Sequence, residues 1–369
     1  MPAAMAEPMG AGVIRMREVD VLIVGLGPGG ASAAAVAAEA GLRVLGVERN
    51  RRIGEPVQCA EFIPTPMGRY ARDEQVLRQR ITGMKTTLPS ESVEVSEFPG
   101  LMVDRAAFDR AIAGRARTAG AELLEGTRLE RLQAEGHIAH VRRGDEETAV
   151  RYRVLVAADG PHSRTAEQLG LPALRTVQTR QYTVPLRQPY FDTDIWLTDE
   201  FPGGYGWLFP KGELANVGMG ADKRFERNLK EPLERLHALL VERALVGSEI
   251  LARTGGAIPV GGLRECLVVG DVLFVGDAAG LTHPITGAGI SAAVVSGERA
   301  GQAAAERLLE DDEDAFAEFE EDVRDQFEVT LQRAVERRNF LDTCWRTDKA
   351  RQDGPMRRGW IAFDEYFAA

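Results

Sequence analysis

Three glycines with the spacing G-x-G-x-x-G directly follow an apolar run near the start of the chain. They are Gly25, Gly27 and Gly30, and the run that precedes them is Val21 to Val24. Gly25 permits a tight turn, Gly27 lets the backbone approach a pyrophosphate, and Gly30 lets the next helix pack closely on the strand. The alanine-rich segment 31–40 supplies that helix, whose first N–H groups favour phosphate. The pattern predicts a dinucleotide site.

An acidic residue stands at the carboxyl end of the second predicted strand, 43–47. Glu48, with Arg49 beside it as a further contact, is placed to accept hydrogen bonds from two ribose hydroxyls. A carboxylate at this position repels a 2′-phosphate, so the pattern predicts an unphosphorylated adenosine, as in NAD or FAD, rather than NADP. The β-α-β unit alone leaves the choice between NAD and FAD open.

Two later strand-to-turn junctions repeat this arrangement. Asp159 ends the apolar run 152–158, and Asp277 follows the run 271–275 just before the turn "TGAG", 286–289. Ligands of open α/β sheets gather at the carboxyl ends of the strands, so three junctions predict one long ligand, FAD. Asp277 would bind the ribityl chain, and the turn with Gly287 would direct helical N–H groups at the flavin. Asp159 considered alone is more typical of an ordinary turn than of a site, and only its combination with Asp277 and the "TGAG" turn favours a site.

Composition excludes several classes of function. The chain has 369 residues, is 44% hydrophobic and carries a net charge of −11, which indicates a globular protein of two lobes and argues against nucleic acid binding. Cys59, Cys266 and Cys344 are far apart and odd in number, so we expect neither a metal cluster nor disulfides, and a cytoplasmic location. No apolar run is long enough for a membrane span, and segment 1–16 predicts a flexible arm.

The predicted fold class combines α/β and α+β parts. Its parts are a Rossmann-like FAD-binding domain (17–80, 100–172 and 255–311), an antiparallel-sheet substrate domain (81–99 and 173–254) and a C-terminal helical segment (312–369). A helix capped by Asp104 is predicted over 103–120.

The last segment predicts a long amphipathic helix. Apolar residues recur there every three or four positions, from Phe316 to Val335. We expect the apolar stripe to pack on the body of the protein, although a docking surface for a partner would give the same pattern.

Aromatic residues gather in the second lobe and form one alternating stripe. Tyr205, Trp207 and Phe209 share one face of a predicted strand. Such a face can bind an apolar substrate above the flavin, or it can pack in the core of the sheet. The spacing by itself leaves both interpretations open.

Four segments together resemble the geranylgeranyl reductase family. They are "GEPVQCAE" (54–61), "GGYGWLFPKG" (203–212), "GGAIPVGG" (255–262) and "GDAAGLTHPITGAGI" (276–290), and the similarity extends over 19–301. The family belongs to the glutathione-reductase-type flavoproteins, which are similar in fold to p-hydroxybenzoate hydroxylase. The resemblance implies an FAD enzyme that reduces carbon–carbon double bonds of polyprenyl chains. It implies FAD contacts at Gly29, Glu48, Cys59, Ala60, Arg105, Leu129, Asp277, Gly289 and Ile290.

Reduction of an unactivated alkene requires a hydride on one carbon and a proton on the other. The candidate proton donors are Cys59, which the resemblance places near the flavin, Tyr205 and His283. The implied substrate is an apolar, isoprenoid-like chain, which would bring a cytoplasmic protein to the periphery of the membrane. Transiently bound NAD(P)H or reduced ferredoxin would supply the electrons.

Three alternatives remain on the sequence alone. A flavin hydroxylase favours a histidine where Gly280 stands and an asparagine where Ser291 stands, and a flavin halogenase favours a second tryptophan where Tyr205 stands. The third alternative is a flavoprotein that passes electrons to a protein partner.

Overall fold

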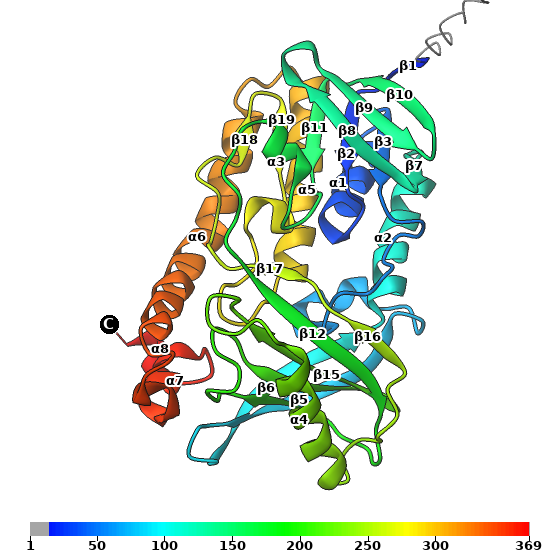
Figure 1. The fold of residues 1–369 in the computed structure, drawn as a ribbon. Coiled ribbons are helices and arrows are strands. Elements are labelled where there is room, and N and C mark those ends of the chain that lie inside the picture. Colours follow the sequence, from blue (N-terminus) through cyan, green and yellow to red (C-terminus); the bar gives the residue numbers. More distant parts are fainter. Residues whose placement is uncertain (1–14, 369) are drawn as a thin grey trace, which may run out of the picture.

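A six-stranded sheet forms the centre of the upper lobe in Figure 1. The computed structural model describes residues 15–368, and the order of this sheet is β18-β19-β11-β2-β3-β7. The strands are β2 (Val21–Val24), β3 (Val44–Glu48), β7 (Glu122–Glu125), β11 (Val154–Ala157), β18 (Val268–Val269) and β19 (Val272–Phe274). Neighbours run parallel except β18 and β19. Every residue of β2 and β11 is buried, as expected for strands covered on both faces.

The alanine-rich helix α1 (Pro28–Glu39) packs against this sheet, and three further helices belong to the same lobe. They are α2 (Arg105–Thr118), α3 (Arg164–Gln168) and α5 (Ile290–Leu309), with the 3-10 turn η3 (Gly276–Ala279) before α5. α1 and α5 approach so closely that a Cβ on Gly297 would collide with the backbone oxygen of Gly29. The predicted cap of α2 is confirmed, because the Asp104 carboxylate accepts a hydrogen bond from the Ala107 N–H.

A four-stranded sheet covers the far end of this lobe. Its order is β1-β10-β9-β8, with β1 (Arg15–Glu18), β8 (Thr127–Gln133), β9 (Ile138–Arg143) and β10 (Glu146–Arg151), and with the 3-10 turn η2 (Ala134–Gly136) between β8 and β9. Residues 1–14 of the expected flexible arm lie outside the described residues. The last two residues of that arm, 15 and 16, begin β1, which pairs with β10 in parallel.

A nine-stranded sheet builds the lower lobe (Figure 1). Its path is β16-β12-β15-β14-β13-β5-β6-β4, and β17 also pairs with β12. The strands are β4 (Phe62–Pro64), β5 (Leu77–Thr87), β6 (Val93–Val103), β12 (Thr176–Pro185), β13 (Asp192–Trp196), β14 (Gly206–Lys211), β15 (Leu214–Ala221), β16 (Ala252–Thr254) and β17 (Ala257–Pro259). The 3-10 turn η1 (Thr65–Tyr70) follows β4.

The lower sheet is not wholly antiparallel, which corrects the sequence expectation at one pair. β13 runs parallel to β5, with Ile195 opposite Thr86. These two strands are more than a hundred residues apart, so no short turn imposes antiparallel pairing on them. Helix α4 (Lys230–Glu242) covers one face of the sheet through Leu233, Leu236 and Leu240. The opposite face is left for the cavity described below.

The C-terminal helix α6 (Ala315–Asp342) runs along both lobes (Figure 1). Its predicted stripe packs on the body, since Phe316, Phe319 and Val323 are buried in the core of the upper lobe. The chain then folds back through η4 (Asp348–Arg351), α7 (Asp353–Gly359) and α8 (Asp364–Phe367), beside the lower sheet. Within residues 15–368, no helix combines the length and the apolar character needed to cross a membrane.

Candidate active site

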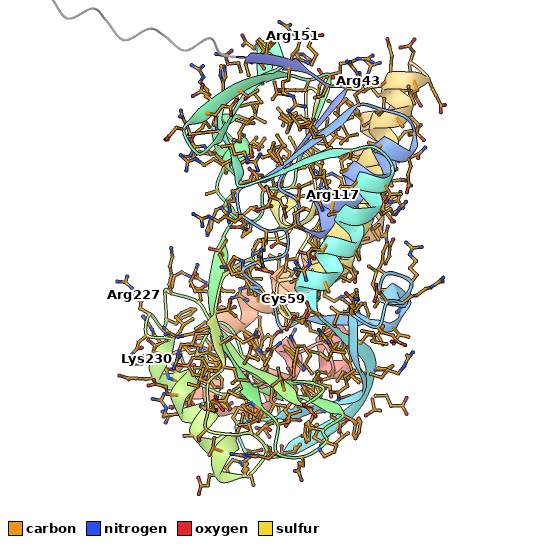
Figure 2. All side chains as sticks on the ribbon, turned by 90° about the vertical axis from the view of Figure 1, so that its right-hand side faces the viewer. Arg43, Cys59, Arg117, Arg151, Arg227 and Lys230 are labelled. Carbon is orange, nitrogen blue, oxygen red and sulfur yellow. The ribbon has the colours of Figure 1, made fainter. Side chains whose placement is uncertain are left out.

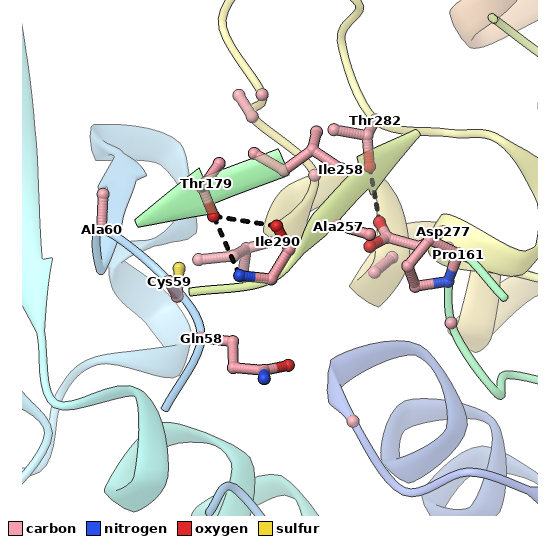
Figure 3. Close-up of a pocket in the computed structure, with 18 of the residues that line it drawn as sticks. Gln58, Cys59, Ala60, Pro161, Thr179, Ala257, Ile258, Asp277, Thr282 and Ile290 are labelled. Atoms are coloured by element: carbon pink, nitrogen blue, oxygen red, sulfur yellow. Dashed lines mark hydrogen bonds between the residues drawn. The ribbon is translucent and has the colours of Figure 1, made fainter. Parts of the chain in front are cut away.

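A cavity of about 890 Å³ joins the two lobes. One wall consists of the carboxyl ends of the parallel strands β2, β3, β11 and β19, and the other is the inner face of the lower sheet. Its volume lies in the range of cofactor and ligand sites, roughly 300–1,000 Å³. Cys59 lies at the junction of the lobes (Figure 2), and Figure 3 shows Cys59, Asp277 and Ile290 around the same space.

The backbone of the glycine turn between β2 and α1 borders this cavity and leaves room for a ligand beside it. Gly25 has φ +92°, which favours glycine, and a Cβ there would collide with the carbonyl of Ala158. A Cβ on Gly27 would meet nothing within 4 Å, so this side of the turn has room for a pyrophosphate. Gly27 also begins α1 without a side-chain cap, which leaves the first N–H groups free for an anion.

Gly30 supports the turn from behind. A Cβ there would collide with the Gly25 backbone oxygen, so this glycine permits the close packing of α1 on the strand, as expected from its spacing. Gly30 is not among the residues that line the cavity. It is the only cofactor residue proposed from the sequence that does not face the cavity in the described part of the chain.

The Glu48 carboxylate is held in place by backbone donors at the end of β3. Its Oε2 accepts from the Leu26 N–H at 3.0 Å, and its Oε1 accepts from the Asn50 N–H at 2.9 Å. A carboxylate offers about four lone-pair positions, so each oxygen keeps capacity for a sugar hydroxyl. Glu48 and the exposed Arg49 both line the cavity.

The α5 end of the cavity contains a second acid. Asp277 is partly buried, and its Oδ1 accepts from the Thr282 hydroxyl at 2.5 Å, as Figure 3 shows. Burial raises the pKa of this carboxyl above its ordinary value. α5 begins behind Gly289 without a side-chain cap, so its first N–H groups are free. Gly287, Gly289 and Ile290 line the same wall.

Asp159 also lines the cavity, but its carboxylate serves the local turn. One oxygen accepts from the Ser163 hydroxyl at 2.6 Å, and the other accepts from the N–H and hydroxyl of Thr165. Asp159 therefore stabilises the start of α3, and its contact with a cofactor remains a prediction. The buried Leu129 faces the same side of the cavity.

The loop that carries Cys59 and Ala60 is fastened to the lower sheet. Gln181 of β12 donates from Nε2 to the Cys59 carbonyl at 3.0 Å and accepts from the Trp207 indole N–H at 3.1 Å. Thr254 of β16 donates to the Val57 carbonyl at 2.7 Å. The backbone of Cys59 and the aromatic strand are thus held in one hydrogen-bonded unit.

Glu61 fixes the same loop from the other side. Its buried carboxylate accepts from the Lys211 ammonium at 2.5 Å, from the Asn216 amide at 2.8 Å and from the Arg105 N–H at 3.0 Å. These donors belong to β14, β15 and α2, so Glu61 ties the loop to both lobes. The segment "GEPVQCAE" includes Glu61, but its partners lie 44 to 155 residues away and no local pattern indicates them.

The Cys59 thiol is protonated at neutral pH. Part of the residue remains open to the cavity, but the surroundings of the thiol raise its pKa, chiefly by burial. Arg105 opposes this shift through its positive charge. The guanidinium of Arg105 is itself partly buried and is held by the buried Asp109 carboxylate through two hydrogen bonds of 2.9 Å.

Tyr205 and His283 are engaged in structural hydrogen bonds. The Tyr205 hydroxyl donates to the Thr286 carbonyl at 2.5 Å, and burial raises its pKa above the ordinary value. The His283 Nδ1 accepts from the Thr286 N–H at 3.2 Å, and burial lowers the pKa of this imidazole to about 4. His283 is therefore neutral at physiological pH, and both side chains shape the loop before α5.

The aromatic stripe faces the cavity rather than the core behind the sheet. Tyr205, Trp207 and Phe209 all line the cavity. The ring centroids of Phe209 and Phe62 are 6.1 Å apart, and those of Tyr205 and Trp360 are 4.9 Å apart. Trp360 directly follows α7. Sequence reasoning missed Trp360 and Gln181, because no spacing within the chain connects them with the stripe.

These features fit FAD. A glycine turn with free helical N–H groups suits a pyrophosphate, Glu48 suits a ribose, and the open space at Gly27 admits the phosphates. The partly buried Asp277 and a second helix start at α5 suit the ribityl chain and the flavin.

Comparison with known proteins defines the class. The family model described as "FAD dependent oxidoreductase" matches residues 69–307. A digeranylgeranylglycerophospholipid reductase of Thermoplasma volcanium is 33% identical, over 85% of this chain and 85% of that protein. Digeranylgeranylglycerophospholipid reductase 1 of Methanopyrus kandleri is 38% identical, over 84% of this chain and 88% of that protein. The chain belongs to the geranylgeranyl reductase family of FAD-dependent oxidoreductases.

Solved structures agree with this assignment. A geranylgeranyl bacteriochlorophyll reductase-like protein of Thermoplasma acidophilum superimposes with a TM-score of 0.85 at 28% identity, over 94% of this chain and 93% of that one. A myxobacterial chondrochloren halogenase superimposes with a TM-score of 0.71 at 18% identity, over 91% of this chain and 86% of that one. The latter likeness shows the fold alone.

Proposed function

We propose that the protein uses FAD to reduce carbon–carbon double bonds of an isoprenoid lipid chain. The observation that carries the proposal is one continuous cavity in which a glycine-rich dinucleotide turn, the partly buried Cys59 thiol and an aromatic wall meet. The names of the relatives, digeranylgeranylglycerophospholipid reductases, support the same substrate class. We further propose a cytoplasmic protein that works at the periphery of the membrane, where such lipids reside.

The upper lobe would hold the cofactor through the residues proposed from the sequence. Gly25, Gly27 and Gly29 would face the pyrophosphate, Glu48 the ribose, and Asp277 the ribityl chain. When bound and reduced, FAD supplies a hydride equivalent. Because the β2–α1 turn would be occupied by FAD, we propose that NAD(P)H or reduced ferredoxin binds transiently to deliver electrons.

Cys59 would supply the proton that completes the reduced bond. Its thiol carries a proton at neutral pH and faces the cavity, whereas His283 is neutral and Tyr205 donates to a backbone carbonyl. The neighbouring Arg105 guanidinium would stabilise the thiolate left after the transfer. Gln181 and Glu61 would hold the Cys59 loop at a fixed distance from the aromatic wall.

The aromatic wall would orient the alkyl chain and exclude water. Trp207 is buried, and its indole N–H is satisfied by Gln181, so the ring presents an apolar surface to the cavity. A dry site protects the reduced cofactor from side reactions.

The test uses purified, prereduced holoprotein without oxygen, mixed rapidly with a lipid bearing geranylgeranyl chains. We expect the visible absorbance of the oxidised flavin to return, and mass spectrometry should show added pairs of hydrogens. Cys59→Ser should retain FAD and lower the rate of alkene reduction by about 10²-fold or more. Cys266→Ser, the same substitution at an exposed thiol that does not line the cavity, should retain the rate. Undiminished reduction by Cys59→Ser would remove the thiol's role, and a substrate hydroxylated on admission of air would favour the hydroxylase alternative.

A further inference from the structure

The aromatic stripe of β14 has two different ends. At the first end, Phe209 lies beside Phe62, and Phe62 stacks on Phe98 at 5.7 Å between ring centroids. Phe98 lines the cavity and is 37% exposed, so this end opens to solvent. At the rise of an extended strand, the stripe from Phe209 to Tyr205 covers about 13 Å.

The second end is closed by the C-terminal segment. The Trp360 ring meets the Tyr205 ring edge-on at 4.9 Å, lines the cavity together with Ile361, and is only 3% exposed. It belongs to an apolar cluster with Leu197 and with Met84 and Ile285, which line the same cavity. An alkyl chain that enters past Phe98 and follows the stripe therefore ends at the Trp360 indole.

Trp360 is held firmly in this position. The preceding Gly359 packs so closely on α6 that a Cβ there would lie 2.5 Å from the Leu341 side chain. Arg357 donates to Glu94 of β6 at 3.1 Å and to Glu365 at 2.7 Å. The end of α7 thus packs on α6 and also contacts the lower sheet, so the indole cannot turn aside without disturbing the packing on Leu341.

We propose that Trp360 is the end stop of the substrate channel and determines how many isoprene units the enzyme accepts. The inference rests on the proposed function and deepens it, because it names the feature of the substrate that is selected. Chains that are too short leave the apolar end unfilled, and chains that are too long meet the indole. The side chains packed around Trp360 are mainly apolar, with Arg338 as a charged neighbour on the cavity wall, so removal of the indole lengthens the channel.

The experiment compares prenyl phosphates of increasing length: geranyl, farnesyl, geranylgeranyl and geranylfarnesyl. Binding to the holoprotein is measured by fluorescence titration, and reduction is measured as kcat/KM. Trp360→Ala should raise the preference for geranylfarnesyl over geranylgeranyl by about tenfold or more, and Trp360→Phe by less, in the same direction. The end stop is supported if the preference for chain length shifts in the same direction in binding and in reduction.

Trp345→Ala is the matched control. Trp345 belongs to the same apolar cluster and is similarly buried, but it lines only a small neighbouring cavity, whereas Trp360 lines that cavity and the main one. Its variant should keep the length preference within about twofold. Unchanged preferences in both Trp360 variants with normal flavin content, or an equal shift in Trp345→Ala, would overturn the inference. If the unmodified protein reduces none of the series, the proposed function fails, while the binding titrations still decide whether Trp360 limits length.

Discussion

The buried Glu61 carboxylate provides a quantitative test of how the Cys59 loop is held. Glu61→Gln conserves shape but removes the charge opposite Lys211, whose side chain is only 14% exposed. The amide must also direct its NH₂ group at one of three existing donors, those of Lys211, Asn216 or the Arg105 backbone. At least one hydrogen bond is therefore lost together with the ion pair.

The expected cost follows from this geometry. Removing one partner of a buried ion pair costs about 3–5 kcal/mol, and we expect the lower end, about 3 kcal/mol of unfolding free energy, because Lys211 keeps some access to water. Urea denaturation of the holoprotein, followed by circular dichroism, measures the loss from the midpoint and slope. The double variant Glu61→Gln with Lys211→Met should cost less than the sum of the two single variants, since their charges interact directly.

Glu94→Gln is the control for the loss of a carboxylate. Glu94 pairs with Arg357 at 3.1 Å, but its side chain is 49% exposed, so its removal should cost below about 1 kcal/mol. The reasoning would be refuted by a loss below about 1 kcal/mol for Glu61→Gln, or by additive costs in the double variant.

Two further predictions concern the cofactor site and acid stability. Gly27→Ala adds a methyl group where nothing lies within 4 Å, so the fold should remain stable while FAD affinity, measured by flavin fluorescence, falls about tenfold or more. Gly114→Ala on α2 should change neither the stability nor the affinity. Unaltered affinity in Gly27→Ala would contradict the phosphate site. Burial lowers the pKa of His283 from 6.5 to about 4. Between these two pH values the unfolded chain binds more protons than the folded protein does, so the unfolding free energy falls by about 3 kcal/mol as the pH drops. Urea midpoints of His283→Gln should depend less on pH across this window, and a slope equal to that of the unmodified protein would exclude this contribution.

The sequence alone was sufficient for features that neighbouring residues encode. The glycine spacing at 25–30, Glu48 at the end of its strand and the Asp104 cap each depend on a few consecutive residues, and each has the predicted local geometry. The period of α6 likewise predicted which face would be buried. Local steric and hydrogen-bonding rules determine such features wherever the segment lies in the fold.

Contacts between distant segments were decided only by the tertiary structure. β13 runs parallel to β5, Gln181 holds the Cys59 carbonyl from 122 residues away, and Trp360 closes the channel beside Tyr205. The packing of one element on another selects these partners, and one chain offers many polar and apolar residues that could have met instead. The sequence therefore determined the cofactor turn and the class of chemistry, whereas the fold decided which residues surround the thiol and where the substrate channel ends.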